Sequence, residues 1–332
     1  MNHTRFSLKL NMHEYNQHAV LIAIGNIQPL ENNFSQLKRK LLIPSLLLVL
    51  ATFALTFSSC KKSDNNNTTP PSTVVIKLNT STTLGQYLVD KDGNALYFFS
   101  NDTKGRNSCS GGCATNWPYF YAGALTQDML GSGLSLADFD TVHSFGVNQT
   151  RYKTWPLYYY APGGVREASG MTSGDGVGTV WFVAKPNYSV MLASGQLVGG
   201  DGNSYTSAYV MGTGSTLYFT DAMGLTLYAY APDSLNKNKF TKADFSNNPS
   251  WPIYDTTIIV PTVVPSFLDK TLFATTNVFG KTQLTYNGWP LYYFGGDSKV
   301  RGNTKGITIP PSKPVGSVWP VMVKGIPMAP HK

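Results

Sequence analysis

Downstream of about residue 74, short runs of aromatic and β-branched residues alternate with clusters of Gly, Asn and Asp. Runs of this kind, bounded by turn residues, predict β-strands. In the run LYFF at 96–99, successive side chains point to opposite faces, and both faces are large and apolar. We therefore expect these strands to be covered on both sides.

Two dipeptides, Asp92-Gly93 and Asn287-Gly288, stand directly before strands of this kind. They are among the strongest sequence signals for a tight hairpin turn. Helical periodicity is rare, and only the segment 134–142 predicts a short helix. The pattern predicts an all-β fold built from antiparallel hairpins, with little helix.

The strand pattern occurs twice in the chain. The pentapeptide WPLYY starts at Trp155 and again at Trp289, 134 positions later, and three further landmarks align at similar offsets. Each copy has two similar parts, each built around an L-Y-x-aromatic strand; the four strands lie at 96–99, 157–160, 227–230 and 291–294. We predict two tandem aromatic-rich lobes, lobe 1 at 74–195 and lobe 2 at 196–332.

The N-terminal part predicts export. Residues 38–59 combine a basic start, an apolar run and two serines before Cys60, which is how a bacterial lipoprotein signal ends. Cys60 is thus the expected lipidation site, with an uncleaved membrane anchor as the alternative, since the apolar run is only marginally long enough to span. Residues 1–37 form an extension that an early start codon would explain, and the polar tract 60–73 predicts a flexible tether. This places the protein in the cell envelope, held by lipid at the outer membrane or cell surface.

The number and type of charged residues exclude some classes of function. From Cys60 onward the chain has 21 Lys and Arg against 16 Asp and Glu, a net charge of +5. No basic run is present, so nucleic acid is not an expected partner. The acids are fifteen Asp and the single Glu167, which excludes a hydrolase that works with a glutamate pair.

The repeated motifs resemble a known family. The motif Y-x-[FWY]-x-x-D occurs at 97–102, 228–233 and 292–297, beside C-x-x-x-C-A-x-x-W-P at 109–118. The chain resembles, over roughly 84–327, the bacterial secreted-repeat lipoproteins of unknown function. It departs from the pattern in two ways, because Gly163 stands where a fourth Asp is expected and lobe 2 has no cysteine. The resemblance implies an envelope lipoprotein and no particular chemistry.

Cys109 and Cys113 are the only cysteine pair in the exported chain. An oxidising compartment favours a disulfide across this small loop, contributing on the order of 2 kcal/mol. The alternative is a redox-active dithiol or a pair of metal ligands. The spacing matches neither C-x-x-C nor C-x-x-C-H, which favours the disulfide.

Three aspartates, Asp102, Asp233 and Asp297, each follow an aromatic strand. An Asp in this position commonly caps the next turn by accepting a backbone N–H. Calcium binding is the alternative, but no contiguous D-x-D-x-D loop accompanies them. No metal site and no cofactor are predicted.

Trp117, Trp155, Trp251 and Trp289 are candidates for stacking on a ligand such as a glycan, since exposed rings form platforms for sugars. Duplication of a hydrophobic core produces the same spacing and is the favoured interpretation.

For catalysis, the mature chain offers only His143 as a credible imidazole base. The sequence therefore predicts a non-catalytic binding or structural module whose partner is a glycan or another envelope protein. A redox-active or metal-binding lipoprotein that uses Cys109 and Cys113 is the alternative.

Overall fold

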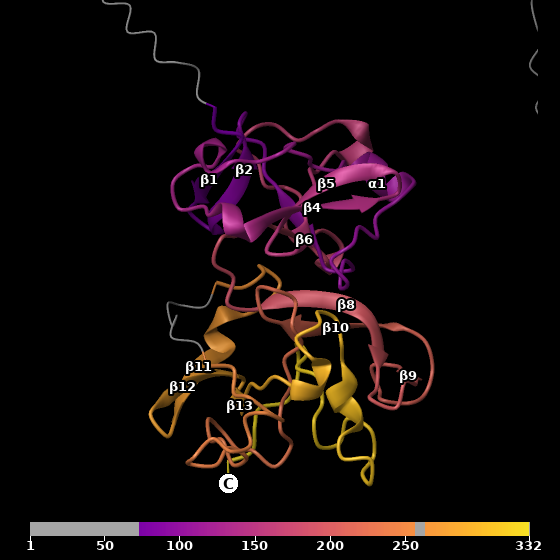
Figure 1. Cartoon of the computed structure of the whole chain (residues 1–332), viewed down its shortest axis with the longest axis vertical. Coiled ribbons are helices and arrows are strands. Elements are labelled where there is room, and N and C mark those ends of the chain that lie inside the picture. Colours follow the sequence, from indigo (N-terminus) through magenta and orange to yellow (C-terminus); the bar gives the residue numbers. More distant parts are fainter. Residues whose placement is uncertain (1–72, 256–262, 332) are drawn as a thin grey trace, which may run out of the picture. The chain divides into compact units, whose positions relative to one another are not determined.

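The structure is a computed structural model that describes residues 73–255 and 263–331. Strands dominate both lobes (Figure 1). Lobe 1 contains β1 (Ile76–Ser81), β2 (Gly85–Asp90), β3 (Tyr97–Phe99), β4 (Phe139–Ser144), β5 (Val147–Tyr152), β6 (Trp155–Pro156) and β7 (Trp181–Val183). Lobe 2 contains β8 (Met191–Val198), β9 (Ser204–Tyr205), β10 (Ser215–Thr220), β11 (Phe273–Val278), β12 (Lys281–Tyr286) and β13 (Trp289–Pro290).

Helical structure is confined to short pieces in the described residues. The single α-helix is α1 (Gly112–Asn116). The 3-10 turns are η1 (Gln127–Met129), η2 (Leu136–Asp138), η3 (Pro162–Gly164), η4 (Val177–Thr179), η5 (Lys270–Leu272), η6 (Gly295–Asp297) and η7 (Lys305–Thr308). The short helix predicted over 134–142 is wrong, because η2 covers three of its residues and β4 begins at Phe139.

All paired strands run antiparallel, which confirms the predicted fold class. Each lobe is built from two units that start with a hairpin. The hairpins are β1–β2 and β4–β5 in lobe 1, and β8–β10 and β11–β12 in lobe 2. In the second unit of each lobe a short third strand, β6 or β13, extends the hairpin. β8 crosses the boundary placed at 195/196, so the first hairpin of lobe 2 begins at Met191.

The L-Y-x-aromatic segments cross at the centre of each lobe. Tyr97 and Tyr158 exchange both backbone hydrogen bonds, at 2.9 and 3.0 Å, and Tyr228 and Tyr292 do the same at 2.8 and 2.9 Å. The three residues of β3 are buried, with Phe98 in one apolar cluster and its neighbours Tyr97 and Phe99 in another. The predicted covering of both strand faces is confirmed.

The two predicted turns are present, and their equivalents differ between lobes. Asn287 and Gly288 have φ of 47° and 83°, the left-handed pair that a tight hairpin turn needs. The equivalent turn in lobe 1 uses Lys153 and Thr154, with φ of 47° and 68°. Side chains with a Cβ are strained in this region, so the lobe 1 turn depends on other contacts.

One arginine from lobe 2 supplies part of those contacts, beside hydrogen bonds from Lys153 Nζ to the carbonyl of Pro186 and from the Thr154 hydroxyl to the carbonyl of Met223. Arg301 donates from Nε to the carbonyl of Thr103 at 2.9 Å, from Nη2 to the carbonyl of Asp102 at 2.9 Å, and from Nη1 to the carbonyl of Thr154 at 2.6 Å. Its guanidinium carbon lies 4.1 Å from the ring centre of Trp155. Burial lowers the pKa of Arg301 to about 10, so the side chain is still charged at neutral pH.

Glycines allow the loops after the aromatic strands to lie directly on the buried rings. A Cβ at Gly306 would come within 2.7 Å of Trp251 and 2.8 Å of Tyr228. Gly174 has the same place in lobe 1, where a Cβ would meet Tyr97 and Tyr160 at 2.9 Å. The loops that contain them are packed against the core of each lobe.

We expect Gly306→Ala to destabilise the protein by about 1–3 kcal/mol, because the added methyl group overpacks a rigid aromatic site. The measurement is the free energy of unfolding in guanidinium chloride. Gly112→Ala is the control, since a Cβ at this exposed position in α1 meets nothing within 4 Å. Equal stabilities of the two variants would contradict the close packing over Tyr228.

Candidate functional site

The motif acids form buried pairs with tyrosines of the other unit in the same lobe. The hydroxyl of Tyr158 donates to Asp102 at 2.7 Å, and in lobe 2 the hydroxyl of Tyr292 donates to Asp233 at the same distance. The reciprocal pair in lobe 2 joins Tyr228 to Asp297, also at 2.7 Å. Each carboxylate thus ties one unit of a lobe to the other.

A fourth carboxylate–tyrosine pair exists although Gly163 stands where the motif has an aspartate. The hydroxyl of Tyr97 donates to Oε1 of Glu167, four positions after Gly163. Oε2 of Glu167 accepts from the backbone N–H and the hydroxyl of Ser173, at 2.9 and 2.7 Å. The glutamate side chain, which is longer than that of aspartate, therefore forms the fourth carboxylate–tyrosine pair from a later position in the loop.

The predicted turn capping by the three aspartates is present. Asp102 accepts the N–H of Ser108 at 2.8 Å, and Asp233 and Asp297 accept the N–H groups of Lys239 and Lys305 at 2.7 and 2.9 Å. The expectation of an ion site finds no support, because both oxygens of each carboxylate already accept hydrogen bonds. Over residues 73–255 and 263–331, no group of three His, Cys, Asp or Glu side chains is placed to hold a metal ion.

Burial changes the titration of these pairs. Loss of hydration raises the pKa of Asp102 and of Asp233 to about 7, against the hydrogen bonds, which lower it. Burial and the neighbouring carboxylate raise the pKa of Tyr158 and Tyr292 far above the usual range. Near neutral pH the two aspartates are therefore partly protonated, and their tyrosines stay neutral.

Most of the candidate tryptophans lie inside the lobes. Trp117 stacks on Trp181 with ring centres 3.8 Å apart, and Trp251 stacks on Trp319 at 3.6 Å. A second ring packs on the other face of each tryptophan: Phe99 on Trp181, Tyr160 on Trp117, Tyr230 on Trp319 and Phe294 on Trp251.

Trp117, Trp155 and Trp251 are buried, so this geometry does not support their proposed role in ligand stacking. The interpretation as duplicated core fits their positions. Trp289 is half-buried, and its Nε1 donates to the carbonyl of Pro327 at 2.8 Å.

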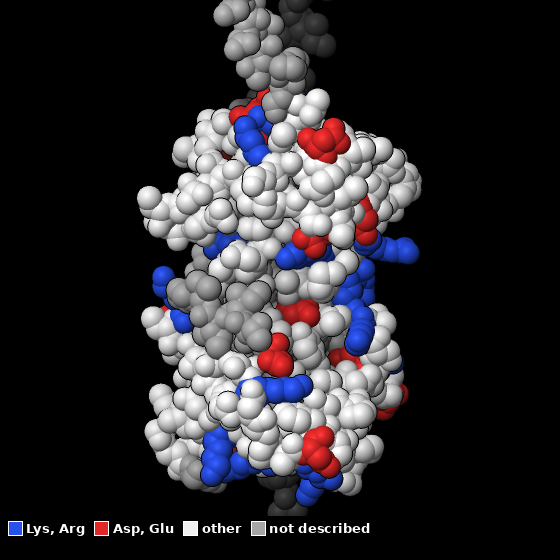
Figure 2. Space-filling view, turned by 60° about the vertical axis from the view of Figure 1, so that its left-hand side comes forward, with Lys and Arg blue, Asp and Glu red and all other residues white. Residues whose placement is uncertain are grey.

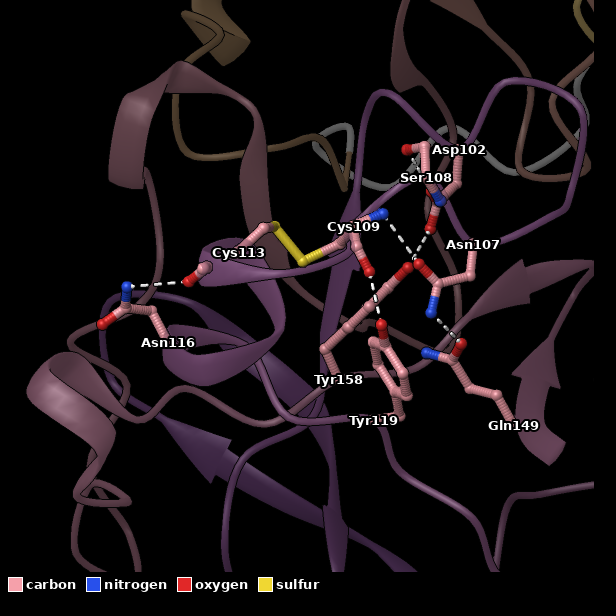
Figure 3. Close-up of a disulfide and its surroundings, with 10 residues drawn as sticks. Asp102, Asn107, Ser108, Cys109, Cys113, Asn116, Tyr119, Gln149 and Tyr158 are labelled. Atoms are coloured by element: carbon pink, nitrogen blue, oxygen red, sulfur yellow. Dashed lines mark hydrogen bonds between the residues drawn. A yellow bond between two sulfur atoms is a disulfide. The ribbon is translucent and has the colours of Figure 1, made fainter. Parts of the chain in front are cut away.

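The cysteine pair forms a disulfide at the start of α1 (Figure 3). Cys109 is buried, its N–H donates to Oδ1 of Asn107 at 2.7 Å, and its carbonyl accepts from the hydroxyl of Tyr119 at 2.6 Å. Asn107 in turn donates to Gln149 at 2.8 Å. These contacts hold the bridge in a local network of structural hydrogen bonds, and the redox alternative remains an untested prediction.

Lobe 2 reproduces this network without cysteine. Asn238 donates to Gln283 at 2.7 Å and accepts the N–H of Phe240 at 3.0 Å. Phe240 thus takes the place of Cys109, and its ring packs edge-on against Trp319 with centres 4.8 Å apart. An aromatic contact therefore stands where lobe 1 has a covalent bond.

Two features with no assigned role remain on the surface. The turns at the ends of the β4–β5 and β11–β12 hairpins expose Phe145 and Phe279. In lobe 2, a groove of about 740 Å³ is lined by residues that include Asn248, Pro252 and Tyr293. The duplicated F-G dipeptide is a signal that could have pointed to the turns, whereas the groove has no local sequence signal.

Charged side chains are dispersed on the face shown in Figure 2, where basic and acidic groups alternate among neutral residues. None of the helices in the described residues is both long and apolar enough to cross a membrane. The predicted signal segment 38–59, Cys60 and most of the tether lie outside the described residues.

The paired units and doubled motifs define a tandem-repeat protein of the all-β class. Residues 80–120 and 274–322 match the model of a family described as a secreted repeat of unknown function. This match confirms the resemblance drawn from the motifs. The first segment covers β2 and the strand at 96–99, and the second covers nearly all of the β11–β12 hairpin and the strand at 291–294. Comparisons with curated proteins and with solved structures find no match.

The raised pKa of Asp102 predicts an unusual pH dependence. Between about pH 4 and 7 the folded state binds a proton at Asp102 that the unfolded chain has released, so this contribution to stability is present at low pH and is lost as the pH rises through about 7. Relative to Asp102→Asn, which does not titrate, we expect the wild type to lose up to about 4 kcal/mol between pH 4 and pH 8.

Guanidinium chloride unfolding at several pH values measures this difference. Asp92→Asn is the matched control, because its carboxylate is exposed and Asn-Gly suits the same turn. A difference between wild type and Asp102→Asn that stays constant with pH would show that Asp102 titrates normally in the folded protein.

Proposed function

We propose that the protein is a lipid-anchored, non-catalytic envelope protein that binds another envelope protein through its hairpin ends. The buried acids and the disulfide support the non-catalytic part, since tyrosine hydroxyls, backbone N–H groups and neighbouring turns already engage them. The export signal ending at Cys60 supports the anchor.

The observation that carries the binding role is a pair of strained, exposed phenylalanines. Phe145 and Phe279 are 60% and 58% exposed and have φ of 50° and 48°. A bulky side chain in the left-handed region costs about 1–2 kcal/mol, and exposure brings no burial in return. Asn or Asp would suit both turns better.

Comparison of the two duplicated hairpins strengthens this observation. The two hairpins share Phe139 with Phe273 and Gln149 with Gln283, which are wholly or partly buried, and at the exposed ends they share the Phe-Gly dipeptide, while the residues before it, Ser144 and Val278, differ. Retention of an exposed, strained ring at both ends supports a role in contact with a partner. Phe279 also touches Phe245 edge-on, with ring centres 6.2 Å apart, which widens the apolar patch in lobe 2.

A protein partner is favoured over a glycan, because the buried tryptophans leave few rings on which a sugar could stack. The glycan partner stays a prediction without structural support.

The anchor has a direct test. We expect Cys60→Ser to lose incorporation of a labelled fatty acid, because the variant has no thiol to acylate. Mass spectrometry of the wild-type N-terminus should show an acylated Cys60. A wild-type protein that starts before residue 60, or carries no lipid, would rule out this anchor.

The binding role is tested with protein that starts at residue 61 and therefore carries neither the signal segment nor the lipid. We expect Phe145→Asn together with Phe279→Asn to raise the melting temperature by a few degrees, since strain is relieved, and to weaken co-sedimentation with envelope fragments at least tenfold. Protease treatment of the fragments should abolish binding by the parent protein. Tyr121→Asn, which removes a different exposed ring, is the control. Unchanged co-sedimentation of the double variant would refute binding through the hairpin ends.

A further inference from the structure

The groove in lobe 2 is best understood from the same place in lobe 1. There the hydroxyl of Tyr159 donates to Asp90 at 2.9 Å, and its ring meets Phe120 edge-on with centres 5.5 Å apart. The guanidinium carbon of Arg166 lies 3.6 Å from the centre of the Tyr159 ring. Lobe 1 therefore covers this tyrosine with an arginine of its own.

Lobe 2 repeats the tyrosine and its supports without the arginine. The hydroxyl of Tyr293 donates to Asp221 at 3.0 Å, and its ring meets Tyr254 edge-on at 5.3 Å. The residue 134 positions after Arg166, the offset that relates the two tyrosines, is Val300. Val300 is 49% exposed and lines the groove together with Tyr293.

The walls of the groove suit a cation on an apolar stem. Leu225, Pro249 and Pro252 supply apolar surface along which a methylene stem can lie. Asp297 adds a carboxyl group to the lining.

We infer that this groove binds the guanidinium group of an arginine side chain presented by a partner protein. The guanidinium stacks on Tyr293 as Arg166 stacks on Tyr159, which is a favourable cation–π contact. The methylene stem lies along the proline and leucine walls. The inference deepens the proposed binding function, on which it rests, by naming the chemistry of the partner.

Lys299 is the one lysine or arginine in the groove lining, and it opposes a cation. Its side chain belongs to an exposed residue, so the repulsion is screened by solvent and salt. Lys299→Ala is therefore expected to strengthen binding of a cationic ligand, whereas the same change would weaken binding of an anion.

The two lobes allow a reciprocal experiment with Nα-acetyl-arginine amide as the probe. Calorimetry and NMR titration of the mature protein in detergent should show one site, and the neutral citrulline analogue should bind at least tenfold more weakly. Val300→Arg, which gives lobe 2 its own arginine, should reduce affinity for the probe at least tenfold. Arg166→Val, which uncovers Tyr159, should raise the stoichiometry from one to two.

Thermal melting shows whether each variant is folded. No binding by the wild type, equal binding of the citrulline analogue, equal binding by Val300→Arg, or a stoichiometry of one in Arg166→Val would each overturn the inference. The variant with Phe145→Asn and Phe279→Asn should bind the probe normally, so a failure of the hairpin ends and a failure of the groove are distinguishable.

Discussion

A carboxylate that leaves water must be given hydrogen-bond donors, and this requirement joins the units of each lobe. Asp102 and Glu167 receive tyrosine hydroxyls from opposite units of lobe 1, and Asp233 and Asp297 do so in lobe 2. Each acid takes one oxygen's hydrogen bonds from its own unit and the other oxygen's from a tyrosine of the opposite unit. The exchanged tyrosines lie on the crossing strands, so these hydrogen bonds hold the two units of each lobe together.

Several parts of this arrangement were predictable from sequence because their causes are local. The Asn287-Gly288 turn is fixed by two adjacent residues with left-handed φ, and the alternation along β3 places its rings on opposite faces. The duplication was visible because rigid aromatic cores tolerate few changes. Capping by Asp102 and its equivalents follows from the position of an acid directly after a strand.

Other parts depend on contacts between distant positions. Glu167 replaces the absent aspartate from a different place in its loop and with a longer side chain, so motif spacing could not identify it. Arg301 donates to Thr154, 147 positions away in the chain, and the sequence around either residue does not predict this contact. Phe145 and Phe279 could not be identified because Phe-Gly is a poor hairpin turn by local rules, and that conflict between rule and structure is the basis of the binding role proposed for them.

The Arg301 contact joins one turn of lobe 1 to lobe 2. The turn at Lys153 and Thr154 holds two residues in an unfavourable backbone conformation, and Arg301, 147 positions later, donates to the Thr154 carbonyl. Part of what stabilises this turn is therefore missing from lobe 1 taken alone, so the stability of the first half of the chain depends on the second.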